Sequence, residues 1–170
     1  MHAAYDVEEW HDFALAAAGA AAALAGLLVV AVSINIREIV ATRSLTRRAG
    51  VALASLTAPL VLALVVLIPI GTPSASPGVL GSLVLVTGIV TGIGLGRLVL
   101  PPQLSSQRTM VQWAFGELVP AVLLVVPACL AGLGLATGSL GGLYWLPVAV
   151  VAGILGGLAQ AWVLLIEILR

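Results

Sequence analysis

Charge is the scarcest property of this sequence. Only 8% of its 170 residues are charged, whereas ordinary soluble domains have about 25%. Hydrophobic residues make up 61% of the chain. Such a composition leaves too few polar side chains to cover a soluble core. It therefore excludes an ordinary soluble domain and indicates a protein that lies within a membrane.

Cysteine and grouped polar side chains are also scarce. The single cysteine, Cys129, lies inside an apolar run, which excludes an internal disulfide and a thiolate metal cluster. His2 and His11 stand near carboxylates, but their spacing matches no metal-ligand pattern. No serine, histidine and carboxylate are grouped for catalysis. We therefore expect neither an enzyme nor a cofactor, and the formal net charge of zero does not indicate nucleic acid as a partner.

Long apolar runs fill most of the remaining sequence. A run of 18 or more apolar residues can cross a hydrocarbon core about 30 Å thick as a helix. Polar breaks rich in Gly, Pro, Ser and Arg separate the runs. We predict an all-α integral membrane protein, a single transmembrane domain over residues 1–170, built as a bundle of five transmembrane helices. The predicted spans are residues 13–36, 51–70, 79–100, 116–136 and 143–168.

Arginine positions predict how the bundle is oriented. Lys and Arg close to span ends are retained on the cytoplasmic side, and here all the basic residues are arginines. If the N-terminus lies outside and the C-terminus is cytoplasmic, every arginine falls on the inner side. The arginines are Arg37, Arg43, Arg47, Arg48, Arg97, Arg108 and Arg170.

Glycines at helical spacing indicate faces where helices pack closely. Gly88, Gly92 and Gly96 recur every four residues and so share one face of the predicted span 79–100. Small residues on one face let another backbone approach in a membrane. The first and last spans carry similar faces. The predicted packing glycines there are Gly19, Gly26, Gly153 and Gly156.

A few polar residues fall within or beside the spans. Gln160 lies deep enough in the last span to require a hydrogen-bond partner. Glu167 stands three residues before Arg170 and could pair with it. Arg97 and Glu117 come from neighbouring spans near the inner side, so we predict a salt bridge between them, with a role as a gate as the alternative.

The segment "VSINIREIV" places Ser33 and Asn35 where the first span should end. A helix that starts near Phe13 has crossed about 30 Å by Ser33, so these polar residues lie at the inner interface. The segment then acts as a stop signal with interfacial anchoring. The alternative is a polar ring at the inner mouth of a pore.

Three segments carry a resemblance to known sequences: "AAAALAGLLVVAVSINIREIV", "LTRRAGVALASL" and "LVVLIPIG". Over residues 10–72 the chain resembles small multi-pass membrane proteins of unknown function from bacteria with high-GC genomes. The resemblance implies a location in the cell inner (plasma) membrane. It implies no activity.

Two functions from different classes fit these features. The first is a homo-oligomeric channel or pore for small ions, with cations favoured because Asp12 would form an acidic ring at the outer mouth. The other residues expected along the ion path are Ser33, Asn35, Gln160 and Glu167.

The second function is a non-catalytic accessory or scaffold subunit, which would pack on another membrane protein through the face of Gly88, Gly92 and Gly96. Expected partners are thus the lipid bilayer, further copies of this chain, or a different membrane protein. A transporter is disfavoured because no inverted repeat is apparent in the sequence.

Overall fold

The structure, a computed structural model, describes residues 6–68, 77–99 and 114–168. Helices account for nearly all of these residues, and five of them are long and apolar enough to cross a membrane. The predicted all-α multi-pass architecture is thus supported. The elements are η1 (Glu8–Trp10), α1 (His11–Ile34), α2 (Ile36–Ala41), α3 (Arg43–Val66), α4 (Pro77–Val99), η2 (Ala114–Leu118, a π-helix), α6 (Val119–Thr137), η3 (Gly142–Trp145) and α7 (Leu146–Ile168).

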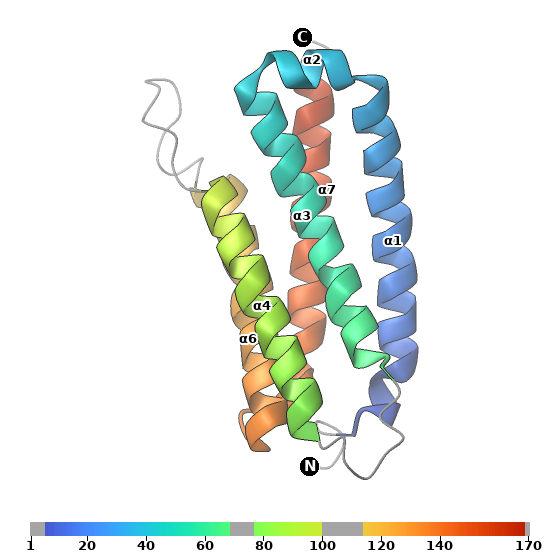
Figure 1. The fold of residues 1–170 in the computed structure, drawn as a ribbon, viewed down its shortest axis with the longest axis vertical. Helices are drawn as coiled ribbons and strands as arrows, with labels where there is room; N and C mark the ends of the chain where they lie inside the picture. Colours follow the sequence, from blue (N-terminus) through green and yellow to red (C-terminus); the bar gives the residue numbers. More distant parts are fainter. Residues whose placement is uncertain (1–5, 69–76, 100–113, 169–170) are drawn as a thin grey trace.

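The long helices alternate in direction along the bundle, so that α1 begins at one end and α7 ends at the other (Figure 1). Helix α3 is central, because it packs against α1, α4 and α7, while α6 joins α4 to α7. Accordingly, 56% of the apolar window of α3 is buried, against 28% in α1 and in α4. Helix α1 is therefore peripheral and rests mainly on α3.

Helix α1 packs through alanine instead of glycine. Its buried positions recur every three or four residues, which is the period of one helix face. Gly19 and Gly26 are exposed on other faces, and a Cβ at either position would meet no heavy atom within 4 Å. Neither glycine packs on another of the described helices, because α3 covers the alanine face, so their predicted packing role stays a prediction. The buried residues of α1 are Ala14, Ala17, Ala18, Ala21, Ala25 and Leu28.

The closest helix contact joins α4 to α6. A Cβ at Gly88 would lie 3.0 Å from the Cys129 Sγ, and one at Gly92 would lie 2.9 Å from Val125 Cγ1. Both glycines therefore pack as predicted, while Gly96 is exposed with nothing within 4 Å. Gly81 lies even closer to α6, because a Cβ there would overlap the backbone of Ala136.

Helix α7 uses its glycines to accommodate proline rings. A Cβ at Gly153 would lie 2.5 Å from Pro59 Cγ of α3, and one at Gly156 would lie 2.8 Å from Pro120 Cβ of α6. The predicted packing role of both glycines is confirmed. Proline widens a helix at the point where the ring projects, so a glycine opposite it keeps the two helices in contact.

Aromatic rings close the end of the bundle at which α1 begins. The Trp10 ring packs edge to face on Phe13, with 5.9 Å between the ring centroids, and on Tyr144, with 5.5 Å between the centroids. Trp145 Nε1 donates a hydrogen bond of 2.8 Å to the Leu140 carbonyl. Such rings with polar tips are typical of the boundary between hydrocarbon and water. They tie the start of α1 to the turn before α7.

The contrast between Gly81 and Gly96 on α4 leads to a matched test. Both Gly81→Ala and Gly96→Ala gain the same helix propensity, but only the Gly81 variant forces a methyl group into α6. We expect Gly81→Ala to be less stable than Gly96→Ala by about 1–3 kcal/mol. Thermal unfolding of the detergent-solubilised protein measures the difference, and equal stabilities would contradict this packing of α4 on α6.

Candidate functional site

The described arginines and the N-terminal carboxylates lie toward opposite ends of the bundle. Asp6, Glu8, Glu9 and Asp12 lie at the end where α1 begins. The described arginines lie toward the opposite end, on α2, in the first turns of α3 and in the last turn of α4 (Figure 1). They are Arg37, Arg43, Arg47, Arg48 and Arg97, while Arg108 and Arg170 lie outside the described residues. This arginine end carries the densest set of polar contacts.

The first span ends where the polar segment predicted, at Ile34. Ser33 Oγ donates to the Val29 carbonyl at 2.7 Å, and Asn35 Nδ2 donates to the Ala31 carbonyl at 3.0 Å. Asn35 itself leaves the helical conformation, with φ −105° and ψ 22°. Both side chains therefore bond to the last turns of their own helix, and Asn35 marks the junction with α2.

Arg47 connects three helices at the arginine end. Its Nη1 donates to Glu117 Oε2 at 2.6 Å and to the Leu98 carbonyl at 3.1 Å, and its Nη2 donates to Glu117 Oε1 at 3.1 Å. Glu117 is only 6% exposed. A two-pronged arginine pair of this kind is stronger and more directional than a single contact.

The predicted partner of Glu117 is therefore wrong: the carboxylate binds Arg47, and Arg97 is exposed. The physical reason is the length of α3. It begins at Arg43, about two turns before the span predicted from residue 51. Those added turns bring Arg47 against the end of α4 and the start of α6.

The neighbouring residue Arg48 forms an ion pair with a different helix, α7. Successive residues in an α-helix point about 100° apart, so Arg48 faces α7 while Arg47 faces α4 and α6. Arg48 Nε lies 3.2 Å from Glu167 Oε2, and Arg48 is 4% exposed. Glu167 is thus bound across helices by Arg48. The predicted pair with Arg170 falls on a residue outside the described part of the chain.

Gln160 has the hydrogen-bond partner that its depth requires. It is 6% exposed, and its Nε2 donates to the Gly116 carbonyl at 2.8 Å. Gly116 lies in the π-helix η2, and residue 120, the position that would donate to this carbonyl in an α-helix, is a proline without an N–H. Gln160 therefore supplies a donor that Pro120 removes. The prediction that Gln160 needs a protein partner is confirmed.

Comparisons with protein-family models, with curated proteins and with solved structures found no match. The chemistry of the arginine end is therefore argued from its geometry alone. In the described ranges, every buried side-chain nitrogen and oxygen has a hydrogen-bond partner, and no group of three or more His, Cys, Asp or Glu could hold a metal ion. The cluster of Arg47, Arg48, Glu117, Glu167 and Gln160 thus acts as a clamp that holds α3, α4, α6 and α7 together.

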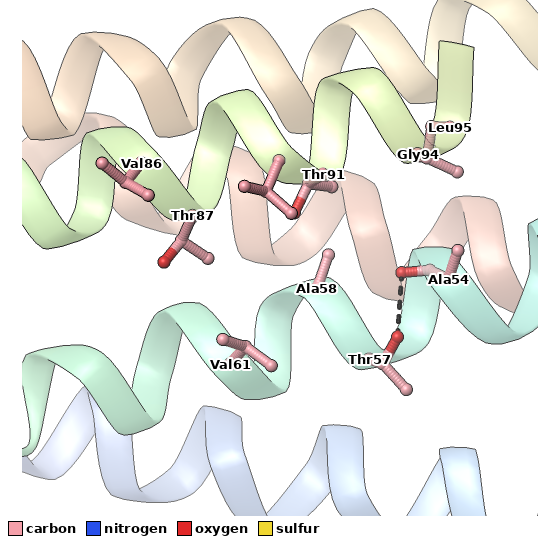
Figure 2. A pocket seen from close by; sticks show the side chains of 10 residues that line it. Ala54, Thr57, Ala58, Val61, Val86, Thr87, Thr91, Gly94 and Leu95 are labelled. Carbon is pink, nitrogen blue, oxygen red and sulfur yellow. Dashed lines mark hydrogen bonds between the residues drawn. The ribbon is translucent and has the colours of Figure 1, made fainter. Parts of the chain in front are cut away.

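A second feature is a groove between α3 and α4, with a volume of about 320 Å³ (Figure 2). Sequence reasoning missed it, because its walls come from two helices whose relative rotation the sequence does not specify. Thr87 and Thr91 lie next to Gly88 and Gly92 in the sequence, but no local pattern links them to Thr57. The lining residues are Ala54, Thr57, Ala58, Val61, Val86, Thr87, Val90, Thr91, Gly94 and Leu95.

The clamp predicts unequal effects for two arginines at the same end. Arg47→Met leaves the Glu117 carboxylate buried without its cation, a change that costs about 3–5 kcal/mol in buried pairs. Arg97→Met removes an exposed charge and should leave stability close to that of the natural protein. Thermal unfolding in detergent measures both variants. If the two lose the same stability, the assignment of Arg47 to Glu117 is wrong.

The role of Gln160 can be isolated by a double-mutant cycle. Gln160→Leu leaves the Gly116 carbonyl without its donor, which we expect to cost about 1–3 kcal/mol. Pro120→Ala restores a backbone N–H at the position that normally serves this carbonyl. In that background the cost of Gln160→Leu should fall. An unchanged cost, measured by unfolding of the four proteins, would show that Gln160 does not compensate for Pro120.

Proposed function

We propose that this protein is a non-catalytic accessory or scaffold subunit that packs laterally on another membrane protein. The observation that carries the proposal is the uncovered outer face of α1. Gly19 and Gly26 lie on this face with no heavy atom within 4 Å of a Cβ at either position. In a membrane, small residues are where helices approach each other most closely. This face is therefore suited to receive a helix from outside the chain.

The fate of the polar residues supports this proposal over a channel. Gln160 and Glu167 bond to groups inside the bundle, so they are not free to line an ion path. Ser33 and Asn35 bond to their own helix. The glycine face of Gly88 and Gly92, first expected to bind a partner, is covered by α6. The outer face of α1 takes its place as the proposed docking face.

The proposed location is the inner (plasma) membrane of a bacterial cell, with the N-terminus outside and the C-terminus cytoplasmic. The charge separation supports this orientation, because the described arginines gather at one end and the N-terminal carboxylates at the other. Arginines near span ends favour the cytoplasmic side.

A homo-oligomeric channel for small cations is the second candidate, and one observation favours it. Asp12, Gly19, Gly26 and Ser33 follow one another at intervals of seven residues and are all exposed. Residues seven apart lie within about 20° of each other around a helix. Copies assembled around this stripe would bring Asp12 carboxylates together at one mouth and Ser33 hydroxyls at the other.

Site-specific photocrosslinking from α1 separates the two candidates. A photoreactive amino acid at Gly26 should capture one foreign membrane protein at a fixed ratio, while the same probe at Gly96, also exposed but on α4, should not. Crosslinking is done in intact cells, and the products are identified by mass spectrometry. Capture of this chain alone, together with a closed ring in native mass spectrometry, would favour the channel. No Gly26 product would contradict both.

A further inference from the structure

The groove between α3 and α4 opens outward from the bundle. Its walls include Val61, Val86 and Val90, which are 44%, 55% and 62% exposed. Figure 2 shows the two helices side by side, with Thr87 and Thr91 of α4 on the side toward α3 and Ala58 of α3 on the side toward α4. Because both helices are of the kind that crosses a membrane, the medium in front of the groove is lipid hydrocarbon.

The threonine hydroxyls do not make the groove strongly polar. Thr57 Oγ1 donates to the Leu53 carbonyl at 2.9 Å, and Thr87 Oγ1 donates to the Leu83 carbonyl at 2.8 Å. These bonds return two of the three threonine hydroxyls in the groove to their own helices and leave methyl groups for contact. The groove therefore suits an apolar occupant.

The dimensions of the groove favour a chain of methylenes over a helix. Its lining runs from Ala54 to Val61 on α3 and from Val86 to Leu95 on α4, about 10–14 Å along the helix axes. A helix about 10 Å across occupies roughly 900 Å³ over that length. The groove holds about 320 Å³, so a single acyl chain fits inside it, whereas a helix would enter it only with its side chains.

Two exposed arginines, Arg43 and Arg97, lie beyond one end of the groove. Gly50 of α3 packs on Leu98 of α4, and Arg47 binds the Leu98 carbonyl. The two helices thus touch just beyond Ala54 and Gly94. Arg43 stands one turn farther along the same face of α3, and Arg97 precedes Leu98 on α4. Both of these arginines are exposed, and within the described residues neither forms an ion pair.

We propose that this seam binds an anionic phospholipid of the leaflet at the arginine end. One acyl chain lies in the groove between α3 and α4, and the phosphate lies against Arg43 and Arg97, next to Arg47. The charge of Arg47 is balanced by Glu117, so the excess positive charge comes from the other two arginines. Basic residues between membrane helices bind anionic headgroups by the same attraction. The inference is independent of which membrane partner α1 meets.

Native mass spectrometry of the full chain in detergent, titrated with phosphatidylglycerol or phosphatidylcholine, tests the site. The natural protein should bind phosphatidylglycerol more tightly. Arg97→Gln should weaken that binding about fivefold, because one arginine near an anionic surface contributes an energy of that size. Arg37→Gln, an exposed change on α2 away from the seam, should leave binding unchanged.

A pair of glycine variants tests the groove itself. A Cβ at Gly94 or at Gly96 meets nothing within 4 Å, so leucine can be accommodated at either position. Gly94→Leu fills the groove and should weaken the binding of both lipids. The leucine of Gly96→Leu lies on another face of α4 and should weaken the binding of neither. Circular dichroism and thermal unfolding of both variants establish that the fold is kept, and the Arg97 variant tests the site independently of the glycine changes.

Three results would overturn the proposal. The first is equal binding of the two lipids by the natural protein. The second is an equal effect of Gly94→Leu and Gly96→Leu on lipid binding. The third is a dimer of this chain that Gly94→Leu dissociates, since the seam would then be an interface between copies and not a lipid site.

Discussion

The bond network of Arg47 is the interaction on which the arginine end depends. In hydrocarbon no water is present to satisfy a polar group, so each must find its partner within the protein. Arg47 satisfies Glu117 and the Leu98 carbonyl together. This requires that α3 extend back to Arg43, and it fixes the end of α4 against the start of α6. Arg48, one residue on, adds α7 through Glu167.

In the middle of the bundle, residues of α7 compensate for two prolines in the helices that pack against it. Pro59 and Pro120 each remove a backbone donor and project a ring toward α7. Gly153 and Gly156 of α7 leave space for these rings, and Gln160, one turn beyond, donates to the carbonyl that Pro120 leaves. One face of α7 therefore leaves space for both proline rings and also supplies a hydrogen-bond donor to the Gly116 carbonyl. Helices α3, α6 and α7 can consequently pack closely despite the prolines.

The sequence predicted features that depend on one helix and missed those that depend on two. Hydropathy located the five long helices, spacing identified Gly88, Gly92, Gly153 and Gly156, and depth indicated that Gln160 needs a partner. The partner of Glu117 depends on how α3 rotates relative to α6, which no local pattern encodes. The face of α1 that packs on α3 was missed for a related reason: in an alanine-rich helix the spacing of small residues does not single out one face, and the buried face is made of alanines, with Gly19 and Gly26 outside it.

In the part of the chain that the structure describes, the buried side-chain polar groups are hydrogen-bonded, and the two surfaces proposed for binding face outward. The outer face of α1 and the groove between α3 and α4 differ in chemistry. The α1 face has two glycines, Gly19 and Gly26, with no contact to another described helix, which suits a helix, whereas the groove is narrow and ends at arginines, which suits a lipid. The groove also adjoins the clamp, since Arg47 closes its end by binding Leu98. If the proposed lipid binds, a phosphate drawn to Arg97 would lie beside Arg47, the residue that joins α3 to α4, and lipid binding would then be linked to the packing of these two helices.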